Sequence, residues 1–169
     1  GKTVATVEQE AALPEGGSEL ALDTAVENPS LWSPENPHLY RIQAELVSDG
    51  EIVDTDEAPL GIRHFRFDPD KGFFLNGSPC KLKGTSVHQD FAGVGIALPD
   101  RLHEKRVEIL KGMGCNAFRC AHNAPAPAFL EACDRLGLMV FDENRKLAVA
   151  HEDVADVHLL VERDRAHPS

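Results

Sequence analysis

The sequence predicts a mixed fold in which antiparallel β-structure is followed by three β/α units. Apolar and polar side chains alternate with the two-residue period of a strand in several segments of residues 1–69. From Phe73 onward, short apolar runs take turns with segments whose apolar residues recur at helical spacing. Three successive strand–helix pairs indicate parallel strands joined by crossover helices. We therefore expect part of a β-sandwich over residues 1–69 and part of a parallel β/α fold over residues 70–169.

The β half is expected to contain four alternating strands, at 19–26, 39–47, 51–53 and 61–67. Ser48-Asp49-Gly50 is a tight-turn signal that joins the second of these strands to the third. The loop between the first two strands is broken by three prolines, Pro29, Pro34 and Pro37. A complete antiparallel sandwich takes about seven strands, so we expect its first strands to precede Gly1.

The first β/α unit follows a short hairpin. Apolar residues at 73–75 and 80–82 flank Asn76-Gly77, which is a strong signal for a two-residue turn. A strand that ends near Val87 is expected next. The helix after it is predicted to begin with Asp100 as its N-cap and to end before Gly114.

The second and third units repeat this order. Residues 115–120 are expected to form a strand, and the next helix is predicted to open at Pro127 and to end at Gly137. Residues 138–141 are uniformly apolar, which is typical of a strand buried on both faces. A third helix, stopped by Pro168, is indicated by four spaced apolar residues, Val154, Val157, Leu160 and Val161.

The composition argues against several kinds of partner. With 28 acidic and 17 basic residues the net charge is -11, which repels phosphate backbones, so no nucleic-acid partner is expected. No apolar run reaches the roughly 20 residues of a membrane span, so no membrane partner is expected. No charged-then-apolar leader opens the chain, which favours a cytoplasmic protein, but a sequence without an initial Met leaves the localisation open.

The cysteines are predicted to be reduced residues of the core. None forms a C-x-x-C pair, and each lies in an apolar strand or helix pattern: Cys80, Cys115, Cys120 and Cys133. Zinc or disulfide chemistry is the alternative. The sequence predicts no cofactor and no metal site.

Polar residues gather where the three parallel strands are predicted to end. In parallel β/α folds the ligand site lies at the carboxyl ends of the strands. A buried Arg, His or carboxylate is costly unless it is paired or functional. We therefore predict a shared polar site built from the residues that follow the three strands, His88, Asp90, Arg119, His122, Asn123, Asp142 and Glu143.

An ordered set of motifs resembles glycoside hydrolase family 2, the family of β-galactosidases, β-glucuronidases and β-mannosidases. The run from Leu31 to Tyr40 resembles the family signature Leu-Trp-Ser-Pro-Glu-x-Pro-x-Leu-Tyr. Residues 163–169 resemble the Arg-Asp-Arg-Asn-His-Pro-Ser stretch of the same enzymes. The matching motifs between these two follow in the family's order, at 61–63, 73–77, 83–84 with His88, 116–119, 121–123, 133–138 and 142–143.

This resemblance implies a fold and an activity for the longer protein. It implies the C-terminal part of an immunoglobulin-like β-sandwich over residues 1–69, and the first three β/α units of a TIM-type catalytic barrel over residues 70–169. The implied activity is that of a retaining exo-β-glycosidase, most similar to a β-galactosidase, with a carbohydrate substrate. In the family, the acid/base and nucleophilic glutamates come from later strands, so we expect them beyond Ser169 and expect this chain alone to be inactive. Whether the full-length protein forms a homo-oligomer is left open.

The resemblance also implies roles for the strand-end residues. His88 and His122 match histidines that contact sugar hydroxyl groups. Asn123 matches the family variant with Asn after the His and is predicted to bind the substrate. Arg119 matches the arginine that supports the nucleophilic carboxylate from the barrel floor. Adjacent strand residues point to opposite faces, so Asp142 and Glu143 cannot both reach the site. We interpret Asp142 and Glu143 as supports of the site that pair with Arg119 or Arg145, and Asp90 as a further support. A catalytic pair of Asp90 with Asp142 is the disfavoured alternative.

Two other functions remain open from the residues themselves. The chain could be a non-catalytic interaction module, or a metal-dependent hydrolase with His88, His122 and Asp142 as ligands. Trp32 is predicted to pack between the two halves. The cluster Glu104, Lys105, Arg106 and Glu108 is interpreted as a solvated helix face. Five other histidines are predicted to be exposed or on helix faces, without a functional role: His64, His103, His151, His158 and His167.

Overall fold

The computed structural model describes the whole chain except residues 13, 15 and 146–150, and describes only the backbone of 151–153. The chain divides into two compact units, residues 1–30 and 31–169. Among the described residues of 1–30 there is no strand, so the strand predicted at 19–26 is wrong. Leu20 and Leu22 are both 50% exposed. An alternating segment becomes a strand only when another strand satisfies its backbone groups, and none pairs with this one. The domain boundary expected after residue 69 stays a prediction.

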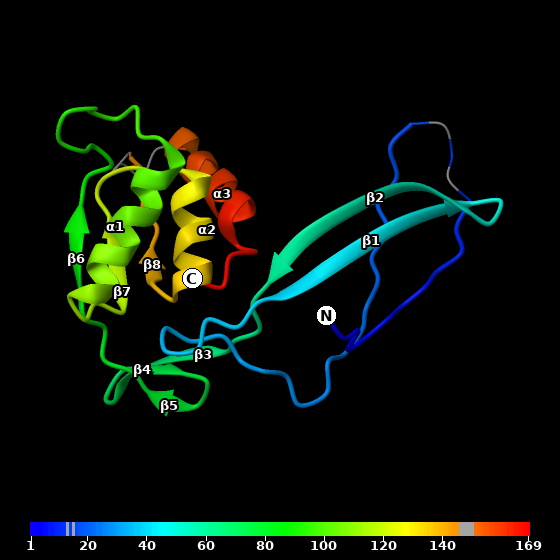
Figure 1. Cartoon of the computed structure of the whole chain (residues 1–169), viewed down its shortest axis with the longest axis horizontal. Helices are drawn as coiled ribbons and strands as arrows, with labels where there is room; N and C mark the ends of the chain where they lie inside the picture. The colour runs from blue at the N-terminus through cyan, green and yellow to red at the C-terminus, as the bar shows by residue number, and fades with distance from the viewer. Residues whose placement is uncertain (13, 15, 146–150) are drawn as a thin grey trace. The chain divides into compact units, whose positions relative to one another are not determined.

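The predicted hairpin around Asp49-Gly50 is present. Strands β1 (Tyr40–Ser48) and β2 (Glu51–Leu60) pair antiparallel, with Tyr40 opposite Leu60 (Figure 1). β2 is much longer than the three residues predicted, because it pairs along the whole of β1. Apolar side chains on both strands are about half exposed: Ile42, Leu46, Val47, Ile52 and Val53. Residues 40–60 therefore form a two-stranded sheet, and no second layer packs on it within the part of the chain that the structure describes.

A second small sheet contains the predicted Asn76-Gly77 turn. Strand β3 (Phe65–Asp68) pairs with β4 (Gly72–Leu75), which pairs with β5 (Ser78–Pro79). The last strand lies at 78–79 rather than at the predicted 80–82, because pairing resumes directly after a two-residue turn. Only the second half of the predicted run at 61–67 is in the sheet.

Three parallel strands form the sheet that positions the site. They are β6 (Gly84–Val87), β7 (Ala117–Cys120) and β8 (Met139–Phe141), in the order β6-β7-β8. In the register of the two pairs, Gly84 lies opposite Ala117, which lies opposite Met139. The predicted parallel strands with intervening helices are confirmed.

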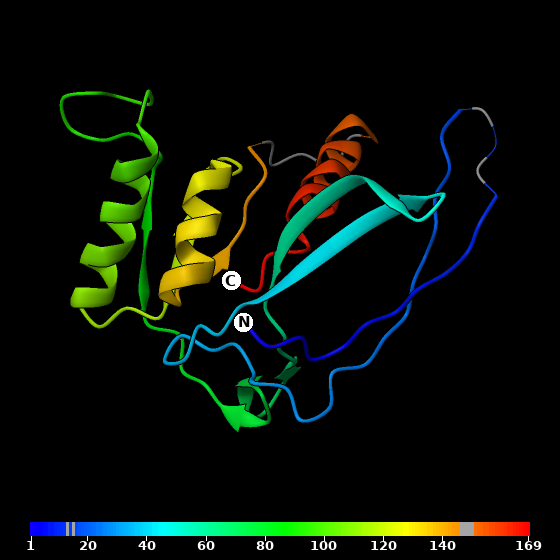
Figure 2. The same ribbon diagram turned by 45° about the vertical axis from the view of Figure 1, so that its right-hand side comes forward.

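Helices α1 (Asp100–Gly112) and α2 (Pro127–Leu136) lie side by side and connect these strands (Figures 1 and 2). Pro99, not Asp100, is the N-cap of α1, and no side chain caps it. Asp100 lies instead in the first turn, where a carboxylate favours the helix dipole. Gly137 ends α2 as predicted, with φ 78°, a left-handed conformation that costs a glycine little.

The main core lies between these two helices and β7. It is built from the apolar faces of all three, Val107, Leu110, Phe118, Cys120, Phe129, Ala132, Cys133 and Leu138. Cys120 and Cys133 are thus core residues, and burial raises the pKa of the Cys120 thiol to about 12. All four cysteines are free thiols, and Cys80 and Cys115 are partly buried. A second cluster joins fully buried Trp32 to Leu75, Ala117 and Met139, as expected of a packing residue.

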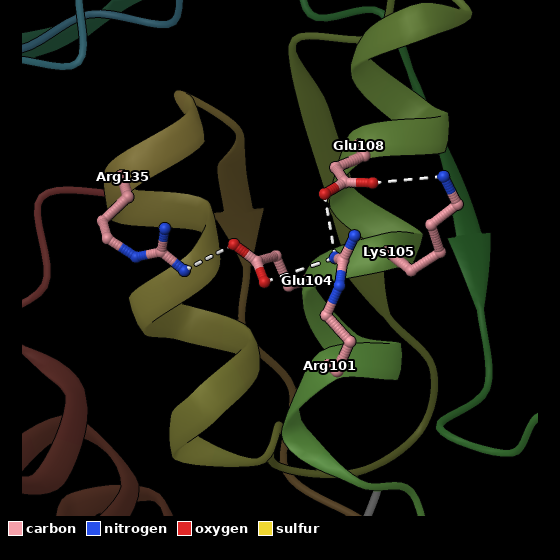
Figure 3. Close-up of polar contacts among 5 residues, drawn as sticks. All are labelled: Arg101, Glu104, Lys105, Glu108 and Arg135. Atoms are coloured by element: carbon pink, nitrogen blue, oxygen red, sulfur yellow. Dashed lines mark hydrogen bonds and ion pairs between the residues drawn. The ribbon is translucent and has the colours of Figure 1, made fainter.

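A group of exposed ion pairs lies on the outer faces of α1 and α2, and one of these pairs links the two helices (Figure 3). Arg135 on α2 reaches Glu104 on α1, with Nη2 3.0 Å from Oε1. Arg101 also reaches Glu104, and both Arg101 and Lys105 pair with Glu108. Solvent-exposed pairs of this kind contribute about 0–1 kcal/mol each. The predicted solvated face is therefore correct for Glu104, Lys105 and Glu108.

Helix α3 (His151–Asp164) confirms the third predicted helix. Its apolar residues Val154, Val157 and Val161 are nevertheless exposed, at 45–54%. Phe141 at the end of β8 is 48% exposed, so the prediction that this strand is buried on both faces is wrong at that residue. Nothing in the described chain covers these apolar side chains.

No helix in the described part of the chain is long and apolar enough to cross a membrane.

Candidate active site

The parallel register brings the three strand ends to one edge of the sheet. Val87 at the end of β6 lies opposite Cys120, and Arg119 on β7 lies opposite Phe141. The residues that follow β6, β7 and β8 therefore emerge at the same edge. The sequence predicted seven site residues there, and the structure brings four of them into contact: His88, Arg119, His122 and Glu143.

Glu143 is the centre of this group. Its Oε2 lies 2.7 Å from Nη2 of Arg119, and its Oε1 lies 2.6 Å from Nδ1 of His122. Nη1 of Arg119 also donates to the hydroxyl of Ser86 on β6, at 3.2 Å. The side chain of Glu143 is 15% exposed, whereas those of Arg119 and His122 are 48% and 49% exposed. A largely covered carboxylate thus holds two half-exposed donors at the surface of the strand ends.

The electrostatics favour an ionised Glu143. The hydrogen bond from His122, with the charges of Arg119 and His122, holds the pKa of the Glu143 carboxyl below its ordinary value. A carboxylate in this state has no proton to donate near neutral pH, and so cannot act as a general acid. It can orient Arg119 and the ring of His122. Binding at Nδ1 leaves the Nε2 edge of that ring for another partner.

His88 completes the group from β6. Its ring lies edge-on to that of His122, with the ring centroids 5.3 Å apart. His88 is itself exposed. Two imidazoles from neighbouring strands can therefore present ring nitrogens to one ligand.

The side chain of Asp142 bonds to α3 and not to Arg119, and its Oδ1 also accepts from the backbone N–H of Glu143 at 2.8 Å. Partial burial of its carboxyl group, and a hydrogen bond with Asp164 at the end of α3, raise its pKa to about 7. Arg163 holds the Asp164 carboxylate with two contacts of 2.6 Å. β8 ends at Phe141, so Asp142 and Glu143 both follow the strand, and the strand alternation expected to separate them does not apply. Asp142 contributes to an acidic pair with α3 and makes no contact with Arg119.

Asp90 and Asn123 do not join the group around Glu143 and bond to other residues. Asn123 is partly buried, and its Oδ1 accepts from Nη1 of Arg145 at 3.1 Å. Arg145 therefore binds an amide, and not the neighbouring acids that the sequence suggested. The backbone carbonyl of Asp90 accepts from Nη2 of Arg106 at 2.6 Å. The structure does not bring the side chain of Asp90 to Glu143.

Arg106 was wrongly placed on the solvated helix face. It is 8% exposed, and its guanidinium also donates to the carbonyls of His88 and Gln89, both at 3.3 Å. These carbonyls follow β6 and lie outside its sheet pairing, so they need a donor. The helical period could have revealed this role, because Arg106 lies three residues after His103 and four before Leu110, both buried. The expectation of an exposed His103 is wrong for the same reason.

Among the other histidines, His64 and His158 are exposed as predicted, and the side chain of His151 lies outside the described residues. His167 is different. It is partly buried and bonded through Nδ1 to Asp134, whose side chain is 2% exposed. The sequence offered no signal for this contact beyond the motifs that contain the two residues.

The candidate metal ligands do not converge. Nδ1 of His122 is bonded to Glu143, and Asp142 is bonded to Asp164. In the described part of the chain, no three His, Cys, Asp or Glu side chains lie close enough to hold a metal ion. The arrangement of His88, His122 and Asp142 therefore does not fit a metal-dependent hydrolase.

Parallel strands joined by helices, with polar side chains at their carboxyl ends, are typical of β/α enzyme domains. The family model "Glycosyl hydrolases family 2" matches residues 1–63, and "Glycosyl hydrolases family 2, TIM barrel domain" matches residues 69–169. Since the second match covers more than half of the sequence, the chain belongs to glycoside hydrolase family 2.

Individual relatives agree with this assignment. The beta-galactosidase BoGH2A of Bacteroides ovatus is 38% identical over 169 residues, covering 92% of this chain and 20% of the relative. A beta-glucuronidase of Bacteroides fragilis is 40% identical over 123 residues, covering 72% of this chain and 18% of the relative. The crystal structure of a family 2 member from Bacteroides cellulosilyticus has a TM-score of 0.77 at 42% identity, covering 85% of this chain and 21% of that one. The chain thus spans about one fifth of the length of these relatives.

Proposed function

We propose that this chain is a segment of a longer retaining exo-β-glycosidase with β-galactosidase-like activity, and carries part of its sugar-binding site. The observation that carries the proposal is Glu143, which bridges Arg119 and His122 at the carboxyl ends of parallel strands. Membership of family 2 and the names of the relatives, which include beta-galactosidases and beta-glucuronidases, support the reaction class. The β/α part is proposed to be the first three units of the barrel.

The exposed ring edges of His88 and His122 are proposed to bind sugar hydroxyl groups. Hydrogen bonds of this kind give specificity, because a site that holds a hydroxyl group rejects an analogue that lacks it. Glu143 is proposed to orient the ring of His122 toward the sugar. Arg119 is proposed to place a positive charge at the base of the site. Asn123, held by Arg145, contributes at the rim. Asp142, bonded to Asp164, and Asp90, whose carbonyl accepts from Arg106, are proposed to support the site.

The catalytic pair is proposed to lie outside these 169 residues. Retaining hydrolysis requires a carboxylic acid and a nucleophilic carboxylate about 5–5.5 Å apart. At the strand ends, Glu143 is held ionised by the hydrogen bond from His122 and by Arg119, and Asp142 is bonded to Asp164. These two carboxyl groups are therefore not proposed to be the acid and the nucleophile.

Expression of the longer reading frame tests this function. The protein should hydrolyse one of three chromogenic substrates, the β-galactoside, β-glucuronide or β-mannoside, and comparison among them identifies the sugar. His122→Ala should raise KM about tenfold, the loss of about one good hydrogen bond to the sugar. Glu131→Gln, an exposed change on α2, is the control and should leave KM unchanged. Lack of hydrolysis of all three by a folded full-length protein would contradict the proposed function.

A further inference from the structure

Asp134 is a buried carboxylate outside the site described above. It lies on α2 with 2% of its side chain exposed. Burying a carboxylate is costly unless it is paired and hydrogen-bonded. Its Oδ1 accepts from the backbone N–H of Ser169 at 3.0 Å, and its Oδ2 lies 2.5 Å from Nδ1 of His167. Both oxygens of Asp134 are therefore occupied by residues 167–169.

The segment that Asp134 holds also bonds to the edge of β8. The N–H of Val140 donates to the carbonyl of Ser169 at 2.9 Å, whereas the N–H of Met139 donates toward β7, to the carbonyl of Asn116. Successive N–H groups of a strand point to opposite edges. Ser169 thus lies at the edge of β8 that faces away from β7, beside the strand as Figures 1 and 2 show for the C-terminus.

Side-chain packing also holds residues 167–169 in place. Pro168 is buried against Gly61, where an added Cβ would lie 2.4 Å from the proline ring. Only glycine leaves room for this contact. The indole Nε1 of buried Trp32 donates to the backbone carbonyl of Asp134 at 2.8 Å. We call the contacts among Trp32, Gly61, Asp134 and residues 167–169 the Asp134 clasp.

We propose that Asp134 is a positioning residue, which holds 167–169 against β8 so that the chain after Ser169 enters the sheet as a fourth parallel strand in a fixed register. This inference rests on the proposed function, because it concerns the longer enzyme. A one-residue slip in a strand turns every side chain to the other face. The clasp therefore determines which side chains of the next strand face the sugar.

The experiment compares Asp134→Asn and Asp134→Ala with wild type in the protein encoded by the longer reading frame. Asp134→Asn keeps the volume and one acceptor oxygen, and so provides a folded variant if Asp134→Ala does not fold. Glu131→Gln on the same helix is the matched control for loss of a carboxylate. Hydrogen–deuterium exchange of peptides covering Met139–Phe141 reports on the clasp itself. Steady-state kinetics report on the position of the next strand.

We expect the Val140 amide to exchange about tenfold faster or more in Asp134→Ala, through loss of charge-assisted hydrogen bonds. We expect kcat to fall about 100-fold, as for a catalytic group displaced by about 1 Å. KM should change little, because His88 and His122 are on other strands, and Asp134→Asn should recover part of kcat. Unchanged exchange at Val140, or a kcat equal to that of Glu131→Gln in both variants, would overturn the proposal. If the wild-type protein has no glycosidase activity, the proposed function fails, and the exchange at Val140 still decides on the clasp.

Discussion

At the scale of single residues, Glu143 combines two bonds whose strength depends on its ionisation. It contacts Arg119 and His122, each of which is about half exposed. The orientation of both donors depends on one carboxylate. Removal of that carboxylate should therefore affect the site more than removal of an exposed acid elsewhere.

Glu143→Gln should lower kcat/KM of the longer protein about tenfold, because Arg119 and His122 lose their common acceptor. The pKa of Glu143 is lowered on folding, so its contribution to stability is present above the ordinary glutamate pKa of about 4.3 and is lost as the pH falls through the lowered value. Urea unfolding at neutral pH and near pH 3 measures this. The difference between wild type and variant should shrink at low pH, and a difference that grows there would contradict the pairing.

At the scale of elements, Arg106 ties α1 to the end of β6. Arg106→Met should leave the carbonyls of His88, Gln89 and Asp90 without their donor and destabilise the fold by about 2 kcal/mol. Lys105→Met, which removes an exposed ion pair with Glu108, is the control and should cost about 0.5 kcal/mol or less. Urea denaturation of both variants compares them. Equal midpoints would mean that Arg106 contributes no more than a surface residue.

The bond between His167 and Asp134 gives the C-terminal segment a pH dependence of opposite sign. The hydrogen bond to Asp134 raises the pKa of His167. Its stabilisation is therefore fully present below the ordinary histidine pKa of about 6.5 and is lost as the pH rises through the raised value. His167→Gln should cost about 2 kcal/mol at pH 5.5 and less at pH 9. Unfolding curves of the variant and wild type at both values test this, and an effect that increases with pH would exclude a charged bond.

At the scale of the whole molecule, apolar side chains are left uncovered on β1, β2 and α3. Exposed apolar surface and open strand edges promote association. The isolated 169-residue chain should therefore associate with increasing concentration and should not hydrolyse chromogenic β-glycosides. Light scattering over a concentration series and a substrate assay check the two statements. A monomer with a cooperative melt would contradict the first, and turnover by a pure preparation would contradict the second.

The sequence predicted elements well where local chemistry decides them. The turns at Asp49-Gly50 and Asn76-Gly77, the end of α2 at Gly137 and the three helices depend on backbone preferences and on spacing within a few residues. The strand expected at 19–26 failed because alternation does not supply a partner strand. Likewise, Val154 and Phe141 have apolar side chains, but burial requires a neighbouring layer that these residues lack.

For the site, the sequence by itself determined which residues emerge at the carboxyl ends of the parallel strands, since strand order and direction follow from the β/α pattern. It also predicted that Asp142 and Glu143 would not both enter the site, but β8 ends at Phe141, so strand alternation is not the reason for their different partners. Only the tertiary structure decided that Glu143 joins Arg119 to His122, that Arg106 holds the loop after β6, and that Asp134 holds 167–169. These contacts join residues 16 to 35 positions apart, and no local pattern encodes such a pairing. They depend on how helices and strands pack, and that packing places each buried charge beside its partner.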